Sequence, residues 1–338
     1  MFTRRSFFFG FASTGFVALA GNPLSGAGAK RKPNLKIGLA ADIHINQWRA
    51  NTERYKAVLK FFDSAKVDGV LVAGDLADSG VKGELAKVGA IWKAQFPGGK
   101  RSDGAPVANL FHYGDHDTGG YLTERGGFLK RHGLVGKSAD EIAAFKAENL
   151  LVNHREKDWE DAFGEKYAPV KVVNVKGYDF VLVHFDPRGG STGCTKAAQE
   201  FLASYKPDTR KPFFYSQHRV PFGLTKYRAK KGGLCDMGDA AKALSKFKNA
   251  IALCGHGHRS FFDERSFFNE NGRVCVEIPA VKFPLAGEPG KSHEDKEHPY
   301  QCLVMNVYDK FVEFERVDFK TGAALADGWK VENAGGKS

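Results

Sequence analysis

Aspartate and histidine, two residue types that bind metal ions well together, recur in five short blocks of the sequence. The blocks are Asp42-Ile43-His44, Gly74-Asp75, Gly114-Asp115-His116-Asp117, Gln217-His218 and Gly255-His256-Gly257-His258. Carboxylate oxygens and imidazole nitrogens are ligands that suit Zn, Mn and Fe ions. One such block alone is weak evidence, because surface loops are rich in these residues. The five blocks together predict one shared metal site.

Each block ends an apolar run of the kind that forms a buried strand. These runs, with their blocks, occupy residues 35–44, 69–76, 108–117, 212–218 and 250–258. Segments with helical spacing lie between the first three runs, at 51–68 and 81–96. This alternation indicates a parallel sheet covered by helices. Because ligands bind outside the carboxyl ends of such strands, we expect the blocks to converge on one crevice.

The remaining segments differ from this alternation. Residues 118–168 begin with a Gly-rich stretch and continue with a polar, helix-prone segment. We expect an insertion over one edge of the sheet, in the position of a lid. Runs between 272 and 318 alternate apolar and polar residues and predict antiparallel strands that complete a second sheet. Since no low-complexity linker separates these parts, residues 30–338 are predicted to form a single domain.

The first 29 residues have the order of an export signal, with charged residues, then an apolar run, then small residues. Arg4 and Arg5 resemble the twin-arginine signal, which carries folded proteins across the bacterial inner membrane. Cleavage is expected after Ala29, with Ala20 as the alternative site; an uncleaved N-terminal anchor is the other interpretation. We therefore expect an exported protein, periplasmic or extracellular, that uses the twin-arginine export machinery. No later stretch reaches the roughly 18 apolar residues of a membrane span, so no stable span is expected after processing.

Basic residues outnumber acidic ones, with 50 Lys and Arg against 39 Asp and Glu and a formal net charge of +11. Removing residues 1–29 deletes only two charged residues, Arg4 and Arg5, and leaves +9. A basic surface attracts phosphorylated or otherwise anionic partners, small-molecule or polymer, but it names none of them. Nucleic acid is a less favoured partner, because the basic residues are scattered and form no dense tract.

The five cysteines all lie in the second half of the chain and include no CxxC pair. A structural four-cysteine zinc site is therefore disfavoured. Cys194 and Cys235 lie in Gly-rich surroundings and are the first pair to test for a disulfide in an exported protein. Cys254, Cys275 and Cys302 lie in apolar runs and are expected to be buried thiols.

The ordered blocks DIH, GDLAD, GDHD, QH and GHGH resemble the calcineurin-like metallophosphoesterases, whose pattern is DxH, GD, GNH(D/E), H and GHxH. The resemblance covers residues 35–260 and is highly specific as an ordered set. It implies an α/β fold in which two mixed β-sheets, flanked by helices, form a four-layered sandwich around two metal ions. Carried over by position, it places Asp42, His44 and His258 on the first ion, Asp75 between both ions, and Asp115, His218 and His256 on the second.

The resemblance also implies a mechanism. Two divalent or mixed-valence ions, Mn, Zn or Fe, lower the pKa of a bridging water, and the resulting hydroxide attacks the phosphate ester in line. His116 would contact the scissile phosphate or protonate its leaving group, with Asp117 holding His116 in the right tautomer. Arg219 and Arg259, each next to a ligand histidine, are candidate contacts for the substrate phosphate. The alternative for both arginines is a solvent-facing charge.

Asp115 departs from the family pattern, which has Asn at this position. A carboxylate adds negative charge to the metal shell, so it should hold a cation more tightly and make the bound water less acidic. Leu76-Ala77-Asp78-Ser79 lacks the Tyr ligand that follows the GD aspartate in purple acid phosphatases, which disfavours that subgroup. The predicted function is a two-metal hydrolase of phosphomonoesters or phosphodiesters. The alternatives are a non-catalytic metal-bound binding protein, if Asp115 prevents turnover, and an exported nuclease, suggested by the charge of +9.

Overall fold

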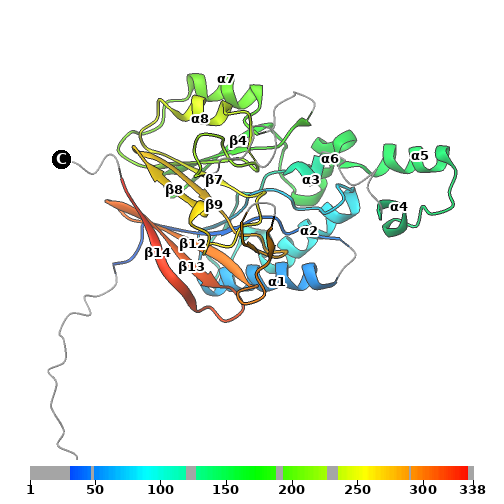
Figure 1. Cartoon of the computed structure of the whole chain (residues 1–338), viewed down its shortest axis with the longest axis horizontal. Coiled ribbons are helices and arrows are strands. Elements are labelled where there is room, and N and C mark those ends of the chain that lie inside the picture. The colour runs from blue at the N-terminus through cyan, green and yellow to red at the C-terminus, as the bar shows by residue number, and fades with distance from the viewer. Residues whose placement is uncertain are drawn as a thin grey trace, which may run out of the picture. The chain divides into compact units, whose positions relative to one another are not determined.

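Two six-stranded β-sheets occupy the centre of the unit formed by Pro33–Ser338 (Figure 1). The computed structural model describes residues 31–46, 49–118, 127–187, 193–226, 235–288 and 291–333. The predicted signal peptide, residues 1–29, lies outside the described residues. Within the described ranges, no helix has the length and apolar character needed to cross a membrane.

The first sheet has the strand order β14-β13-β12-β1-β2-β3. Its parallel half consists of β1 (Leu35–Ala40), β2 (Gly69–Val72) and β3 (Ala108–Asn109). Its antiparallel half consists of β12 (Gln301–Val307), β13 (Phe311–Asp318) and β14 (Ala324–Glu332). The prediction that the C-terminal runs complete the second sheet is therefore wrong for β12 and β13. The apolar strand β1 lies inside the molecule and needs a hydrogen-bonding partner on each edge, and β12 supplies the second one.

The second sheet has the order β4-β5-β6-β7-β9-β8. Its inner strands β5 (Tyr178–Val183), β6 (Phe213–Ser216), β7 (Ala250–Cys254) and β9 (Arg273–Glu277) run parallel. The edge strands β4 (Val170–Val175) and β8 (Phe267–Glu270) are antiparallel to their neighbours. A separate two-stranded sheet consists of β10 (Leu285–Ala286) and β11 (His293–Glu294).

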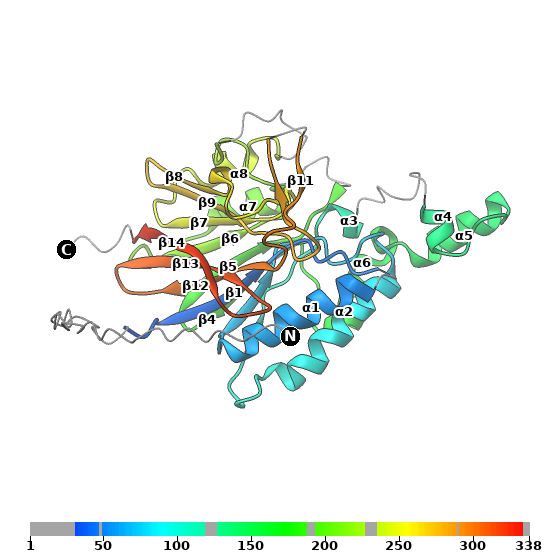
Figure 2. The ribbon, with the colours of Figure 1, turned by 60° about the horizontal axis from the view of Figure 1, so that its bottom comes forward.

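Helices cover the outer faces of both sheets and complete four layers (Figure 2). α1 (Arg49–Ser64), α2 (Lys82–Gln95) and α6 (Leu151–Phe163) share an apolar core with the first sheet. α7 (Lys196–Ser204) and α8 (Asp239–Leu244) share another core with the second sheet. A third core contains apolar side chains of both sheets and fills the space between them. The predicted α/β fold of two mixed sheets flanked by helices is confirmed.

The insertion at 118–168 contains two different parts. Its second part, α6, packs along α2 and buries Trp159 and Arg155 completely. These large side chains make α6 an integral part of the helical layer, so the expectation of a lid is wrong for this half of the insertion.

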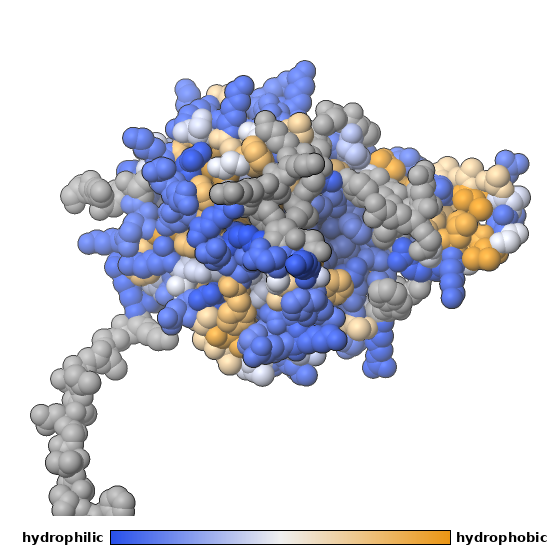
Figure 3. Space-filling view, viewed as in Figure 1, coloured by the Kyte–Doolittle hydropathy of each residue, from blue (hydrophilic) through white to orange (hydrophobic). Residues whose placement is uncertain are grey.

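The first part of the insertion stands out from the two sheets in both ribbon views (Figures 1 and 2). It contains α4 (Phe128–Arg131) and α5 (Ala139–Asn149), and α5 begins at a capping box formed by Ser138 and Glu141. The space-filling view shows hydrophobic side chains gathered over this part, where Leu129 and Val135 are exposed (Figure 3). A small apolar cluster around Phe128 ties α4 to the body of the protein through Val81.

All five cysteines are buried and none of them forms a disulfide bond. The suggested disulfide between Cys194 and Cys235 is therefore not present, and the Gly-rich surroundings of these residues gave a misleading indication of exposure. Cys254, Cys275 and Cys302 are buried thiols as predicted. Cys254 and Cys275 come from the adjacent strands β7 and β9, and their sulfur atoms lie 3.7 Å apart.

Candidate metal centre

All five Asp/His blocks lie beyond the carboxyl ends of parallel strands. Three blocks follow β1, β2 and β3 of the first sheet, and the third of these begins the short helix α3 (Asp115–Thr118). The other two follow β6 and β7 of the second sheet. The polar residues that follow the parallel strands of both sheets thus lie close together. The structure brings together all seven residues that were predicted as metal ligands, in two groups that share one member.

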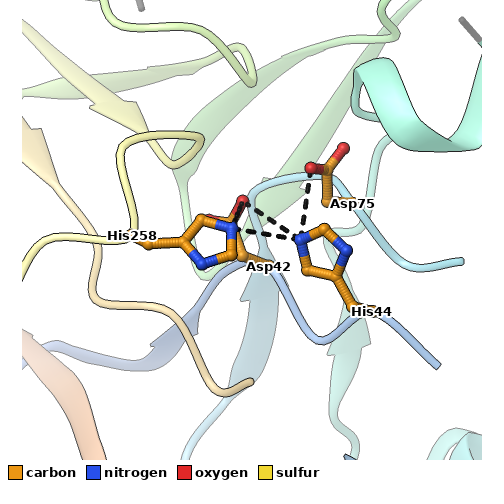
Figure 4. Close-up of side chains that lie close together, drawn as sticks. All are labelled: Asp42, His44, Asp75 and His258. Atoms are coloured by element: carbon orange, nitrogen blue, oxygen red, sulfur yellow. Dashed lines mark hydrogen bonds and ion pairs between the residues drawn. The ribbon is translucent and has the colours of Figure 1, made fainter. Parts of the chain in front are cut away.

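The first group consists of Asp42, His44, Asp75 and His258, with one ligand atom of each lying within 4.8 Å of the others. Figure 4 shows the two imidazole rings and the two carboxylates directed toward one another. His44 Nε2 is 3.1 Å from His258 Nε2 and 3.4 Å from Asp75 Oδ2. Asp42 Oδ1 is 3.2 Å from His258 Nε2. Side chains from three different strand ends therefore converge on one point.

The second group consists of Asp75, Asp115, His218 and His256, again within 4.8 Å. His218 Nε2 is 3.1 Å from Asp75 Oδ1 and 3.5 Å from Asp115 Oδ1. His256 Nδ1 is 3.2 Å from His218 Nε2 and 3.4 Å from Asp115 Oδ2. The two oxygens of Asp75 thus face different groups, Oδ2 the first and Oδ1 the second.

The backbone of the site is strained. Eight non-glycine residues have positive φ in the described part of the chain, and five of them belong to the predicted ligand set. Those five are Asp42 (52°), His44 (45°), Asp75 (53°), His256 (72°) and His258 (53°). Such conformations cost about 1–3 kcal/mol each and persist where the surrounding structure enforces them, typically at functional sites. The concentration of strain marks this place independently of the residue types.

Glycines precede four of the ligands, Gly257 before His258 included, because no side chain fits there. A Cβ atom on Gly114 would lie 2.2 Å from Asp75 Oδ1, and one on Gly74 would lie 2.5 Å from His218 Nδ1. A Cβ atom on Gly255 would lie 2.7 Å from Asp42 Oδ2. At these three glycines, any larger residue would displace a member of the two groups, as the sequence predicts for a crowded centre.

The hydrogen bonds around the two ligand groups leave lone pairs of ligand nitrogen atoms directed toward the centre of each group. His44 Nδ1 lies 3.0 Å from Asp78 Oδ1, and His218 Nδ1 lies 2.7 Å from the carbonyl oxygen of Ala73. These acceptors place the proton of each ring on Nδ1, so Nε2 is free to bind a cation. Asp115 Oδ1 is buried and has no hydrogen-bond partner in the described part of the chain. His44 Nε2 lies 3.1 Å from His258 Nε2, and a cation bound between these nitrogen atoms and the carboxylates would fit the arrangement.

The charges of Asp42, His44 and His256 agree with this arrangement. Burial alone would raise the pKa of Asp42, but the neighbouring His258 and His218 bring it below its ordinary value. Burial lowers the pKa of His44 to about 4 and also lowers that of His256, so both rings are neutral at pH 7. Neutral imidazoles beside ionised carboxylates are the forms that bind metal ions.

Comparison with known families agrees with the geometry. The sequence model described as calcineurin-like phosphoesterase matches residues 35–260, which is about two thirds of the chain. The chain belongs to the calcineurin-like phosphoesterase family. It is accordingly a metal-dependent phosphoesterase, and the two groups that share Asp75 indicate a dinuclear metal site. A sequence search among curated proteins gives no match.

Solved structures share the fold of this phosphoesterase. A purple acid phosphatase from yellow lupin is 15% identical with a TM-score of 0.54, over 89% of this chain and 55% of that one. GAP50, described as the anchor in the inner membrane complex of Plasmodium, is 12% identical with a TM-score of 0.52, over 88% and 89%. A dimetal phosphatase from Danio rerio is 11% identical with a TM-score of 0.48, over 90% and 100%. At these identities the likeness to the first two structures concerns the fold alone.

His116 of the phosphoesterase lies beside the metal centre, outside the two groups that share Asp75, and forms a third candidate group with His44 and Asp78. Its Nδ1 is 2.7 Å from the carbonyl oxygen of Asp78, and its ring meets the ring of His44 edge to face at 4.5 Å. Its backbone amide donates to Asp75 Oδ1 at 2.9 Å. A carbonyl acceptor on Nδ1 leaves Nε2 as the atom for exchange of a proton with a substrate.

Asp117 does not hold His116 in place, contrary to the prediction. Its carboxylate accepts hydrogen bonds from the backbone amides of Leu76 (3.2 Å), Ala77 (2.7 Å) and Gly114 (2.7 Å). Burial raises the pKa of Asp117 to about 7, and the charge of Asp75 adds to this effect. Asp117 therefore fixes the loop that carries Asp75. The backbone carbonyl oxygen of Asp78, and not the carboxylate of Asp117, contacts His116 Nδ1.

Arg219 pairs with Asp115, a member of the second ligand group. Its Nε and Nη2 both donate to Asp115 Oδ2, at 3.1 and 2.8 Å. The side chain is only 7% exposed, so the solvent-facing alternative is wrong, while a contact with the substrate phosphate stays a prediction. One cation thus covers Oδ2 of the ligand that departs from the family pattern. His218 and His256 of the second group also face the two oxygens of this ligand, at 3.5 and 3.4 Å.

Arg259 is bound by two carboxylates. Its Nε donates to Glu277 Oε2 at 3.0 Å, and its Nη1 lies 3.4 Å from Asp263 Oδ2. The side chain is 6% exposed. The prediction of a phosphate contact is not supported by this geometry, because two carboxylates from neighbouring segments bind the guanidinium group.

Asp78 is a residue of the site that the sequence prediction missed. Its Oδ1 lies 3.0 Å from both His44 Nδ1 and Lys282 Nζ, and its Oδ2 lies 3.4 Å from Arg131 Nη1. Burial alone would raise the pKa of Asp78, but His44 and Lys282 bring it well below its ordinary value. The available signal was the second aspartate of GDLAD, three residues after Asp75.

Proposed function

We propose that this phosphoesterase hydrolyses phosphomonoesters or phosphodiesters with two divalent or mixed-valence ions, Mn, Zn or Fe. In this proposal Asp42, His44 and His258 hold one ion, and Asp115, His218 and His256 hold the other, with Asp75 between them. The observation that supports it most strongly is the pair of four-residue groups, each within 4.8 Å, that share Asp75. When bound, such a pair of ions activates a water molecule as the nucleophile and neutralises phosphate oxygens.

The side chains of the protein supply the rest of the reaction. His116 donates a proton from Nε2 to the leaving oxygen, because its Nδ1 is held by the carbonyl oxygen of Asp78 at 2.7 Å. Asp78 also orients His44 through Nδ1, so one residue positions both a ligand and the proton donor. A side chain positioned in this way contributes about 10²–10⁴-fold to a reaction that needs proton transfer.

The alternative of a non-catalytic metal-bound protein depends on the extra charge of Asp115. Arg219 supports the catalytic proposal, because both of its donors bind Asp115 Oδ2 and its positive charge offsets the carboxylate. The net charge that Asp115 and Arg219 add to the second group is then the same as that of a neutral asparagine. No described contact favours the nuclease alternative.

The test compares esters with good and poor leaving groups. 4-Nitrophenyl phosphate, bis(4-nitrophenyl) phosphate and alkyl phosphates are offered with Mn, Zn or Fe, and with a chelator. We expect turnover that is lost on chelation. His116→Asn should slow alkyl esters by about 10²–10⁴-fold but 4-nitrophenyl esters far less, because 4-nitrophenolate leaves without a proton. His293→Asn, at an exposed position, is the control. Absence of turnover with every ester and ion would refute the proposal.

We further infer that the chain is exported through the twin-arginine machinery. The support is the sequence of residues 1–29, with Arg4-Arg5 before an apolar run. A fusion of residues 1–29 to a reporter that is active only after export tests this. Export should be lost when both arginines are changed to lysine, and export of that variant would contradict the inference.

A further inference from the structure

Glu277 is a buried carboxylate beside the metal centre that has no part in the proposed reaction. It ends β9, and it pairs with Cys254, the last residue of the parallel strand β7. The block that contains His256 and His258 follows β7 directly. The carboxyl end of β9 therefore brings Glu277 to the same edge of the second sheet as these two ligand histidines, with only 2% of the residue exposed.

The carboxylate of Glu277 lies against the turn between the two histidines. A Cβ atom on Gly257 would lie 1.8 Å from Glu277 Oε1 and 2.9 Å from Cδ of the same side chain. Gly257 is not among the glycines with positive φ, so the contact with Glu277, and not the backbone conformation, excludes a side chain here. Gly255 differs, because a Cβ atom there would meet Asp42, which is itself a member of the first ligand group.

An ion pair holds Glu277 in this position. Its Oε2 accepts a hydrogen bond from Arg259 Nε at 3.0 Å, and Arg259 Nη1 lies 3.4 Å from Asp263 Oδ2. Glu277 Oε1 is buried and has no hydrogen-bond partner in the described part of the chain. A buried carboxylate oxygen without such a partner is unfavourable, so the pair with Arg259 and the surrounding packing determine where Oε1 lies. The contact between Glu277 and Gly257 is therefore one of shape.

The turn requires such a contact because its backbone is strained. His256 and His258 have positive φ, 72° and 53°, on either side of Gly257, and such conformations persist only where the surrounding structure enforces them. The amide of His256 donates to the two oxygens of Asp42, at 3.2 and 3.0 Å, which fixes the start of the turn. The histidines belong to different ligand groups, His258 to the first and His256 to the second. A shift of this one turn would therefore move a ligand in each group.

We propose that Glu277 is a positioning residue of the metal centre: its carboxylate, held by Arg259, fixes the turn at Gly257 and thereby keeps His256 and His258 in place for two different ions. This inference rests on the proposed two-metal function. Glu277 acts through the turn, since it belongs to neither ligand group. Residues that orient metal ligands from outside typically contribute about 10–100-fold to metal affinity or activity.

Two substitutions of complementary size test this role in the full-length protein. Gly257→Ala places a methyl group against Glu277 Oε1 and should weaken Mn binding by about 10–100-fold. Glu277→Asp keeps the charge toward Arg259 but is one methylene shorter, so alone it should weaken Mn binding by about tenfold. The double variant has room for the methyl group and should bind Mn at least about fivefold more tightly than Gly257→Ala. Calorimetric titration with Mn measures the affinity, and turnover of 4-nitrophenyl phosphate at a fixed Mn concentration should follow the same order.

Two further variants separate this contact from general effects. Gly255→Ala places its methyl group against Asp42 and the carbonyl oxygen of Ala73, so Glu277→Asp should not restore its Mn binding. Glu270→Gln removes an exposed carboxylate from the neighbouring strand β8 and should leave the Mn affinity unchanged. If Gly257→Ala does not fold, the Mn affinity of Glu277→Asp compared with that of Glu270→Gln decides the question.

A purely structural role of Glu277 predicts a different result. Glu277→Asp would then lose unfolding free energy in denaturant with a chelator present, yet bind Mn within about twofold of the wild type, and this outcome would overturn the inference. A double variant that binds Mn no better than Gly257→Ala would overturn it too, as would equal restoration of Gly255→Ala. In each case turnover by the wild type leaves the proposed function standing. A wild type that binds no metal ion and hydrolyses no ester would overturn both.

Discussion

Replacing Arg219 with methionine tests whether the charge of Asp115 is balanced within the protein. Both partners are buried, with 7% and 3% of their side chains exposed, and two donors of Arg219 bind one oxygen of Asp115. Removing one partner of a buried ion pair costs about 3–5 kcal/mol, because the remaining charge has no partner. We therefore expect metal-free Arg219→Met to lose about 3 kcal/mol of unfolding free energy. Guanidinium unfolding in the presence of a chelator measures this loss.

The same substitution should strengthen metal binding. A bound cation supplies the positive charge that the variant lacks. The free energy of metal binding should therefore become more favourable by the amount of stability that the metal-free variant has lost. A recovery of about 3 kcal/mol corresponds to roughly 100-fold tighter binding. Calorimetric titration with Mn measures the affinity directly. If Arg219 instead bound the substrate phosphate, metal affinity would stay unchanged while KM rose.

The reciprocal variant completes the cycle. Asp115→Asn leaves Arg219 as an uncompensated buried cation, so this variant should lose stability and bind metal more weakly. In the double variant neither charge is present, and its loss of stability should be at least about 2 kcal/mol smaller than the two single losses together. Single losses that add to within about 0.5 kcal/mol would refute the coupling, as would weaker metal binding by Arg219→Met.

Two other buried carboxylates give separate predictions. Asp117→Asn should lower the unfolding free energy of the metal-free protein by about 2 kcal/mol and weaken metal binding. An amide group cannot accept all three backbone hydrogen bonds that fix the loop after Asp75. Thermal unfolding measures the stability and calorimetry the metal affinity, and an unchanged metal affinity would contradict this role. Burial raises the pKa of Glu84 to about 7 from 4.5, so the stability contributed by its protonated form is present below pH 4.5 and is lost as the pH rises through 7. As the pH rises from 4.5 to 8, the unfolding free energy of Glu84→Gln should therefore rise by about 2–3 kcal/mol relative to that of the wild type under the same metal conditions. Denaturant unfolding measures this difference. A difference that stays constant over this pH range would show that Glu84 does not titrate there.

The ligand set and the fold class were predictable because both depend on local sequence. An apolar run that ends in Asp or His fixes which residues lie at a strand end, and the parallel arrangement brings strand ends together. The glycine before Asp75 and the glycine before Asp115 follow from the same crowding. Apolar alternation alone does not say which sheet a late strand joins. The sequence prediction therefore assigned β12 to the wrong sheet. The position of β12 depends on the free edge of β1, a strand that is far away in the sequence.

The direction of side chains next to the ligands was harder to predict. Asp115, His116 and Asp117 form the first turn of helix α3, where successive side chains point about 100° apart. Asp117 is therefore aimed away from His116 although it is the next residue. Arg219 and Arg259 each follow a ligand histidine, but each is bound by a carboxylate distant in sequence, 104 residues away for Arg219 and 18 residues away for Arg259.

Charge balance predicts a cation beside Asp115. A carboxylate in place of a neutral amide, inside a buried site, requires either a more highly charged ion or a nearby cation. Arg219 and Arg259 both adjoin ligand histidines at strand ends of the second sheet, so this criterion alone does not choose between them. Asp115 follows β3 of the first sheet and Arg219 follows β6 of the second, so the pair joins the two sheets across the metal centre. The residue that departs from the family pattern and the arginine that follows His218 are thus best understood as one unit, which is why the two substitutions should be coupled.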